Sequence, residues 1–404
     1  MSTRLGIQIQ VPTDKKGMAR FINEKRPPYI KHIDPQDDFL DLLDPDLYHT
    51  VRLWWDASSQ DVDNPGAAAE RIIKRVRIWA REGLVKAVEG YNEVSGGHGW
   101  TPGTDSTEHL RRFLLCDAEM GRIIEGELGI SYIGGNWSVG CPSDIDLWTV
   151  PAMTEWAGKL KAIGLHEYNA PHLWQNESFD PRLHLDDATP ALIAARREMY
   201  LSSGWCVLRY RKVYAKLELM QDQGRLATIP EFHITEVGID SGAPNGKWPV
   251  FAQGGWRSFL RADEYMAELA WQDRQWLMDD YVNGAAIFLM GGNQDWVSHD
   301  AWRDGRFMEL YGQYLLDHRD LTGEELEAEL AREAQKHVIP YVPGNAFRLI
   351  AQAQGWDEAM SDEFEWRGYR AQVYLDKSGA VPVQRIVYAP VDKWDQWQVI
   401  EREN

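Results

Sequence analysis

The chain has little basic charge for its 404 residues. Its 43 lysines and arginines are outnumbered by 62 aspartates and glutamates, which leaves a formal net charge of −19. Nucleic acids and anionic membrane surfaces are bound through basic patches, so we expect neither as a partner, nor an extended polyanionic substrate. A neutral polymer is compatible with this charge.

Other absences narrow the class of protein further. The three cysteines, Cys116, Cys141 and Cys206, form no CxxC pair and are expected to be buried or idle thiols. No segment reaches the ~20 apolar residues of a membrane span, and the first residues lack the ~7–15-residue apolar stretch of a signal peptide. The compartment stays open: cytoplasmic, or released without a signal.

Several catalytic fingerprints are also missing. The sequence contains no GxSxG elbow, P-loop or dinucleotide fingerprint, and no HxH or HExxH spacing that suggests a metal site. We therefore expect neither a cofactor nor a metal.

Strand-like and helix-like runs alternate along the first 320 residues, and eight such pairs can be counted. Eight alternating units predict a (β/α)8 barrel, because the competing doubly wound sheet would usually carry a Gly-rich turn after its first strand. A helix over 151–164 is expected to close at Gly164. The expected strands are 5–12, 27–34, 48–56, 85–93, 130–136, 165–171, 231–240 and 285–293.

The pattern changes near residue 320. We expect residues 1–320 to form the catalytic barrel. Residues 321–404 are expected to form a small α+β appendix, with two helices followed by a β-hairpin around Lys377 to Gly379.

Two glutamates stand at the ends of apolar runs. Glu93 closes the fourth expected strand, and Glu236 lies near the end of the seventh. The C-terminal ends of barrel strands meet at one face, so both carboxylates should point into one site. Two such carboxylates can act as acid/base and nucleophile in glycoside hydrolysis.

Further polar residues are expected at the same face. Arg52 lies on the third strand and could anchor a carboxylate or form a structural ion pair. Asn92 directly precedes the first glutamate. Alternation along the sixth strand turns His166 and Tyr168 toward the lumen and Glu167 toward the helices.

Tryptophan is the compositional outlier, with 19 residues. Its flat apolar ring with a polar edge suits stacking on the C–H faces of sugars, although any single ring could be a core residue. Six tryptophans follow five different strands at one rim and are candidates for substrate binding. They are Trp54, Trp55, Trp100, Trp137, Trp174 and Trp296.

These motifs resemble the clan A glycoside hydrolases, retaining (β/α)8 enzymes that include cellulases, mannanases and xylanases. That clan places Asn-Glu at the end of the fourth strand and Glu at the end of the seventh. Asn92-Glu93 and Glu236 match these positions, and His166 and Tyr168 match a His-x-Tyr pattern on the sixth strand. The resemblance covers about residues 1–320.

The resemblance implies cleavage of β-glycosidic bonds in a poly- or oligosaccharide, with retention. Glu93 would be the acid/base and Glu236 the nucleophile, while Asn92 would bind the sugar 2-hydroxyl. Val94 departs from the pattern, because many members have proline there. A barrel that binds glycan without cleaving it and an unrelated metal-dependent hydrolase stay open as alternatives.

The tail is loosely similar to small modules that end some bacterial and phage cell-wall enzymes. That likeness implies peptidoglycan or another envelope glycan as an alternative substrate, and a phage-associated origin as an alternative compartment. The other interpretation is a packing domain that braces the barrel. The sugar, the linkage and the oligomeric state stay open.

Overall fold

Two compact units make up the chain in a computed structural model. Thr3–Asp317 form one unit, and His318–Asn404 with the first two residues form the other. The structure describes the chain except residues 1–2, 56–59, 94–105, 143–144, 171, 174–203, 205, 241–253, most of 320–357, 362–363, 377–382, 392–395 and 403–404.

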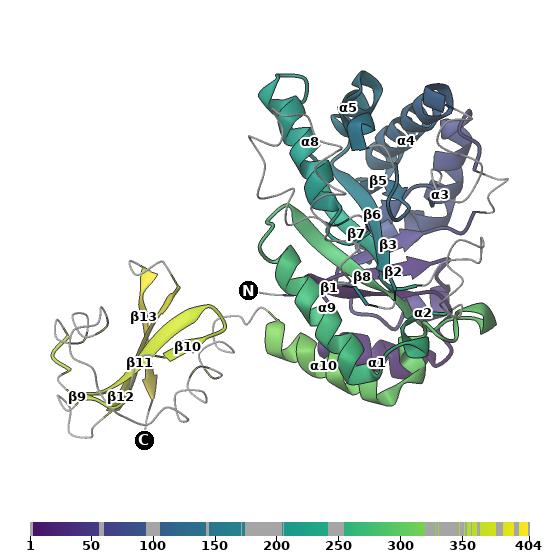
Figure 1. The fold of residues 1–404 in the computed structure, drawn as a ribbon. Coiled ribbons are helices and arrows are strands. Elements are labelled where there is room, and N and C mark those ends of the chain that lie inside the picture. Colours follow the sequence, from purple (N-terminus) through teal and green to yellow (C-terminus); the bar gives the residue numbers. More distant parts are fainter. Residues whose placement is uncertain are drawn as a thin grey trace. The chain divides into compact units, whose positions relative to one another are not determined.

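Eight parallel strands close into a barrel in the order β1 to β8 (Figure 1). The pairing of β1 with β8 completes the ring, with Leu5 opposite Ala285. The predicted fold class is confirmed. The strands are β1 (Leu5–Ile9), β2 (Ile30–Ile33), β3 (His49–Arg52), β4 (Val85–Glu89), β5 (Ser131–Trp137), β6 (Ala162–Asn169), β7 (Glu231–Ile239) and β8 (Val282–Met290).

Helices surround the strands (Figure 1). Two helices have a side-chain N-cap. The side chain of Asp14 accepts from the backbone N–H of Gly17 at the start of α1, and that of Asn64 accepts from the backbone N–H of Ala67 at the start of α3. Among the described residues, no helix is long and apolar enough to cross a membrane. The helices are α1 (Lys15–Lys25), α2 (Asp37–Leu40), α3 (Pro65–Arg81), α4 (Ser106–Leu128), α5 (Pro151–Ala157), α8 (Tyr210–Asp222), α9 (Ala262–Trp276) and α10 (Gly305–His318).

The predicted end of the fifth helix at Gly164 is wrong. Helix α5 ends at Ala157, and Gly164 lies inside β6. A Cβ at position 164 would lie 2.2 Å from Oδ1 of Asn136 and 3.1 Å from Cγ2 of Thr235. The glycine therefore makes room for two side chains from neighbouring strands, a close approach that also favours glycine within strands.

The C-terminal unit is built on an antiparallel sheet with the order β10-β11-β12-β13, and β9 pairs with β11. Its long central pair, β11 and β12, runs from Tyr369 opposite Pro390 to Asp376 opposite Val383. The predicted turn around 377–379 and most of the predicted helix pair lie outside the described residues. The strands are β9 (Glu358–Ala359), β10 (Phe364–Trp366), β11 (Tyr369–Asp376), β12 (Val383–Pro390) and β13 (Gln398–Arg402).

A buried pair of histidines, His32 on β2 and His49 on β3, should make the barrel sensitive to acid. Nε2 of His49 donates to the carbonyl of Asp44 at 2.9 Å, and His32 lies 3.1 Å from its Nδ1. Burial lowers the pKa of His49 to about 4, against about 6.5 in unfolded chains. Between these values only the unfolded chain takes up the proton, so this contribution to stability is present above pH ~6.5 and falls toward pH ~4.

We expect His49→Gln to flatten the pH dependence of the free energy of unfolding. Because one titrating group is removed, the slope between about pH 6.5 and pH 4 should fall by up to ~1.4 kcal/mol per pH unit. Urea titrations at several pH values measure the free energy of unfolding of both proteins and hence this slope. Parallel slopes for the two proteins would contradict the assignment.

Candidate active site

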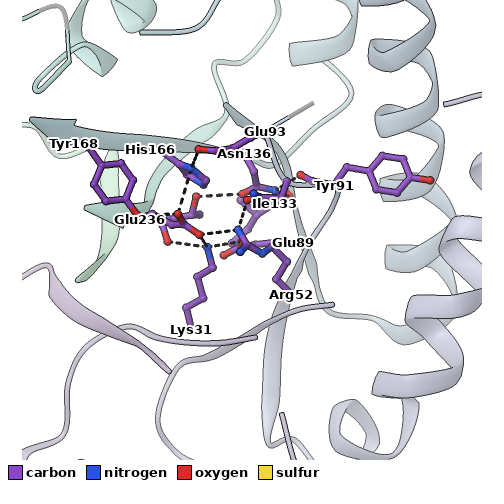
Figure 2. A network of polar contacts seen from close by, with 12 residues as sticks. Lys31, Arg52, Glu89, Tyr91, Glu93, Ile133, Asn136, His166, Tyr168 and Glu236 are labelled. Atoms are coloured by element: carbon purple, nitrogen blue, oxygen red, sulfur yellow. Dashed lines mark hydrogen bonds and ion pairs between the residues drawn. The ribbon is translucent and has the colours of Figure 1, made fainter. Parts of the chain in front are cut away.

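Glu236 lies on β7 at the centre of a network of polar side chains (Figure 2). Its Oε1 accepts from Nη1 of Arg52 at 2.7 Å and from Nζ of Lys31 at 3.1 Å. Its Oε2 accepts from the hydroxyl of Tyr168 at 2.8 Å and lies 3.5 Å from Nδ1 of His166. Side chains from three strands, β2, β3 and β6, thus fix the position of this carboxylate on β7.

These partners favour the ionised form of Glu236. Burial alone would raise the pKa of this carboxyl. The positive charges of His166, Lys31 and Arg52 and the hydrogen bond from Tyr168 outweigh burial and hold the pKa well below its usual range. The carboxylate is therefore available as an anion at neutral pH.

Glu93 approaches the same site from beyond β4. The strand ends at Glu89, four residues earlier than predicted, and Glu93 has a left-handed backbone with φ of 49°. Its N–H donates to the carbonyl of Asn136 at 3.1 Å, which stabilises this uncommon conformation. Its side chain is 28% exposed, against 7% for Glu236, so Glu93 is the more accessible carboxylate.

His166 on β6 lies between the two glutamates (Figure 2). Its Nδ1 is 2.7 Å from Oε1 of Glu93 and 3.5 Å from Oε2 of Glu236. One ligand atom from each of these three residues lies within 4.8 Å of the other two. A proton on Nδ1 would therefore face both carboxylates.

A divalent cation could in principle use this trio of side chains as ligands. However, Arg52 and Lys31 already bring two positive charges to Oε1 of Glu236, and both are almost fully buried. A further cation would be repelled by them. The arrangement suits proton transfer and nucleophilic attack better than metal binding.

Arg52 and Asn92 form a second contact at the rim. Nη1 of Arg52 donates to Oδ1 of Asn92 as well as to Glu236. Nε2 of Gln60 donates to the backbone carbonyl of Asn92 at 3.2 Å. The sequence left open whether Arg52 anchors a carboxylate of the site or forms a structural ion pair. In the structure, Arg52 contacts Glu236, the predicted nucleophile.

Asn136, at the end of β5, was missed in the sequence. Its Nδ2 donates to the carbonyls of Tyr91 at 3.4 Å and Ile133 at 3.3 Å, and its Oδ1 accepts from the hydroxyl of Thr235 at 3.2 Å. It thereby links the segment after β4 to β5 and β7. The only sign of Asn136 in the sequence was its position directly after Gly134 and Gly135, at the end of a predicted strand.

Lys31 and Glu89 were also missed. Nζ of Lys31 lies 3.0 Å from Oε2 of Glu89, and the side chains of both are 0% exposed. A lysine inside the apolar run of β2 was the signal, because a buried charge in a strand needs a partner across the lumen. The partner, on β4, could not be identified from spacing.

Two of the candidate tryptophans present a ring surface. Trp54, after β3, is 50% exposed. Trp296 is half-buried, and its ring centroid lies 5.0 Å from that of Phe288 in an edge-to-face contact. Trp100 and Trp174 lie outside the described residues.

The structure places the other two candidate tryptophans in the core, so the expectation that they face a substrate is corrected. Trp55 is 7% exposed, with the guanidinium of Arg71 3.9 Å from its ring centroid. Trp137 is 1% exposed and packs edge-to-face against Trp148 and Trp156. Both are core residues, which the sequence allowed for any single tryptophan.

No family model matches the sequence, and no curated protein matches it. Several solved structures with a similar chain arrangement carry the names of glycoside hydrolases. They include a GH2 beta-galacturonidase from Eisenbergiella tayi, at 12% identity and a TM-score of 0.43, covering 72% of this chain and 44% of that one. This chain therefore spans less than half of that protein.

Two further structures are covered over most of their length. A GH128 endo-beta-1,3-glucanase from Pseudomonas viridiflava has 12% identity and a TM-score of 0.42, with 78% of this chain and 97% of that one covered. A family 51 alpha-L-arabinofuranosidase from Bifidobacterium longum has 10% identity and a TM-score of 0.46, with 96% and 82% covered.

Proposed function

We propose that the protein is a retaining glycoside hydrolase that cleaves β-glycosidic bonds of a poly- or oligosaccharide. The observation that carries the proposal is the separation of the two carboxylates: an oxygen of Glu93 and an oxygen of Glu236 lie within 4.8 Å. Retaining glycosidases hold their carboxyl groups about 5–5.5 Å apart, whereas inverting enzymes need ~6.5–9.5 Å to admit a water molecule.

In the first step, a carboxylate oxygen of Glu236 attacks the anomeric carbon and the glycosidic C–O bond breaks. Glu93 gives its proton to the departing oxygen. The cationic surroundings of Glu236, which keep it ionised, support the role of nucleophile, and the more exposed position of Glu93 supports that of acid.

In the second step, water attacks the anomeric carbon and Glu93 takes up its proton. The bond to Glu236 breaks, and the configuration at the anomeric carbon is retained. Tyr168 and His166 keep the carboxylates oriented through the contacts described above, and Asn92 would bind the sugar 2-hydroxyl.

The substrate is proposed to be a neutral glycan, in keeping with the net charge of −19. The exposed ring of Trp54 and the half-buried ring of Trp296 are proposed to contact sugar faces. Peptidoglycan or another envelope glycan is the second candidate, and residues 321–404 would then be a targeting module rather than a brace.

A labelling experiment tests the reaction class. The protein is incubated with dinitrophenyl 2-deoxy-2-fluoro-β-glycosides of glucose, mannose, galactose and xylose, and the labelled peptide is mapped by mass spectrometry. We expect one sugar to be attached at Glu236. Turnover of the matching unfluorinated glycoside should release the β-anomer first, as followed by proton NMR.

Two results would overturn the proposal. Release of the α-anomer would indicate inversion. Binding without labelling or hydrolysis across this panel and a panel of neutral and cell-wall glycans would favour the non-catalytic alternative.

A further inference from the structure

A second carboxylate, that of Glu89, belongs to the same polar network as the proposed nucleophile Glu236 (Figure 2). Glu89 on β4 and Lys31 on β2 are 0% exposed, and Oε2 of Glu89 is 3.0 Å from Nζ of Lys31. The same Nζ donates to Oε1 of Glu236 at 3.1 Å and to the carbonyl of Thr235 at 2.9 Å. Nζ of Lys31 thus lies within 3.1 Å of three oxygen atoms: it donates hydrogen bonds to Glu236 and Thr235, and it forms an ion pair with Oε2 of Glu89.

The charges balance while Glu236 is free. In the group formed by Lys31, Arg52, Glu236 and Glu89, two positive charges face two negative charges on almost completely buried side chains, while His166 pairs with Glu93 at 2.7 Å. During the proposed reaction this balance changes, because a carboxylate that bonds to the anomeric carbon becomes a neutral ester. Two buried cations would then have lost their shared anion, and an unpaired buried charge is costly.

Glu89 is placed to compensate for that loss. Its contact with Lys31 involves no atom of Glu236, so it persists when the ester forms. It lies away from solvent, and the hydroxyl of Tyr29 is 3.5 Å from its other oxygen. Glu89 cannot touch a sugar from this position and can act only through Lys31.

We propose that Glu89 is a positioning residue that serves as the permanent counterion of Lys31 and thereby stabilises the glycosyl-enzyme intermediate. The proposal rests on the proposed function. The groups that surround Lys31 support it: burial and the neighbouring Arg52 lower the pKa of Lys31, and Glu236 and Glu89 raise it. When the charge of Glu236 is lost, Glu89 alone keeps this lysine charged.

The test compares Glu89→Gln with the wild type in the formation and decay of the trapped 2-fluoroglycosyl-enzyme. We expect formation to slow by about tenfold or more, because the intermediate now contains two buried cations without an anion. Reactivation of the trapped enzyme should become several times faster, since the destabilised state decays more readily. A purely structural defect would slow both steps.

Two further variants keep the test decisive. Glu167→Gln replaces another buried carboxylate, one that accepts from Gln272 on the helix side of β6, and should leave both rates unchanged. In a Lys31→Met background the cation is gone, so adding Glu89→Gln should not slow formation further. This comparison remains informative if Glu89→Gln alone does not fold.

The outcomes separate the two proposals. If the wild type is not labelled at Glu236, the proposed function fails and this inference falls with it. If the wild type is labelled but Glu89→Gln forms and loses the adduct at the wild-type rates, only the role of Glu89 is overturned. An equal slowing by Glu89→Gln with and without Lys31 would also overturn it.

Discussion

Glu236→Gln is expected to lower turnover by roughly 10⁴-fold or more while the affinity for glycan stays close to that of the wild type. The amide fills the same space but cannot attack the anomeric carbon. The amide carbonyl can accept from Arg52 in place of Oε1, and the amide NH2 can donate to the hydroxyl oxygen of Tyr168 in place of Oε2, so the site should keep its shape. Initial rates on a dinitrophenyl glycoside measure the loss, and calorimetry with an oligosaccharide measures the binding.

Chemical rescue makes this prediction specific to a nucleophile. In Glu236→Ala the space beside the anomeric carbon is open, and azide should attack there to give a glycosyl azide of inverted configuration. Glu167→Gln, on the other face of the barrel wall, is the matched control and should turn over at the wild-type rate. Retained activity in Glu236→Gln, or the same rescue in the control, would disprove the assignment.

Glu93→Ala is expected to lower turnover of unactivated glycans by about 10²–10⁴-fold, the usual contribution of a general acid. Glycosylation by a dinitrophenyl glycoside should be nearly unaffected, because that leaving group departs without a proton. Deglycosylation still needs a base, so the intermediate on Glu236 should accumulate.

Stopped-flow and mass spectrometry distinguish this behaviour from that of the nucleophile variant. Glu93→Ala should show a burst of dinitrophenol and a stable adduct, and azide should restore turnover with a glycosyl azide of retained configuration. Equal losses on activated and unactivated substrates, without a burst, would contradict the role of acid/base.

Much of the barrel could be predicted because its determinants are local. Apolar runs and helical spacing fixed the order of the strands, and the order of the strands placed Glu93 and Glu236 at one face. Alternation along β6 also separated His166 from Glu167, which is 1% exposed and accepts from Gln272 on α9. These features need only the period of a strand and the rule that parallel strand ends meet.

The tertiary structure decided what lies across the lumen. Lys31 and Glu89 are 58 residues apart in the sequence (89 − 31), and their pairing depends on how β2 and β4 face each other in the closed barrel. Gly164 resembled a helix end in the sequence but makes room for Asn136. Trp137 stands at the C-terminal end of a strand, where a rim position was expected, and yet it is buried and packs against Trp156 of helix α5. Residue type and spacing determine which side chains reach the site, but the contacts among them depend on register and closure, which no local segment contains.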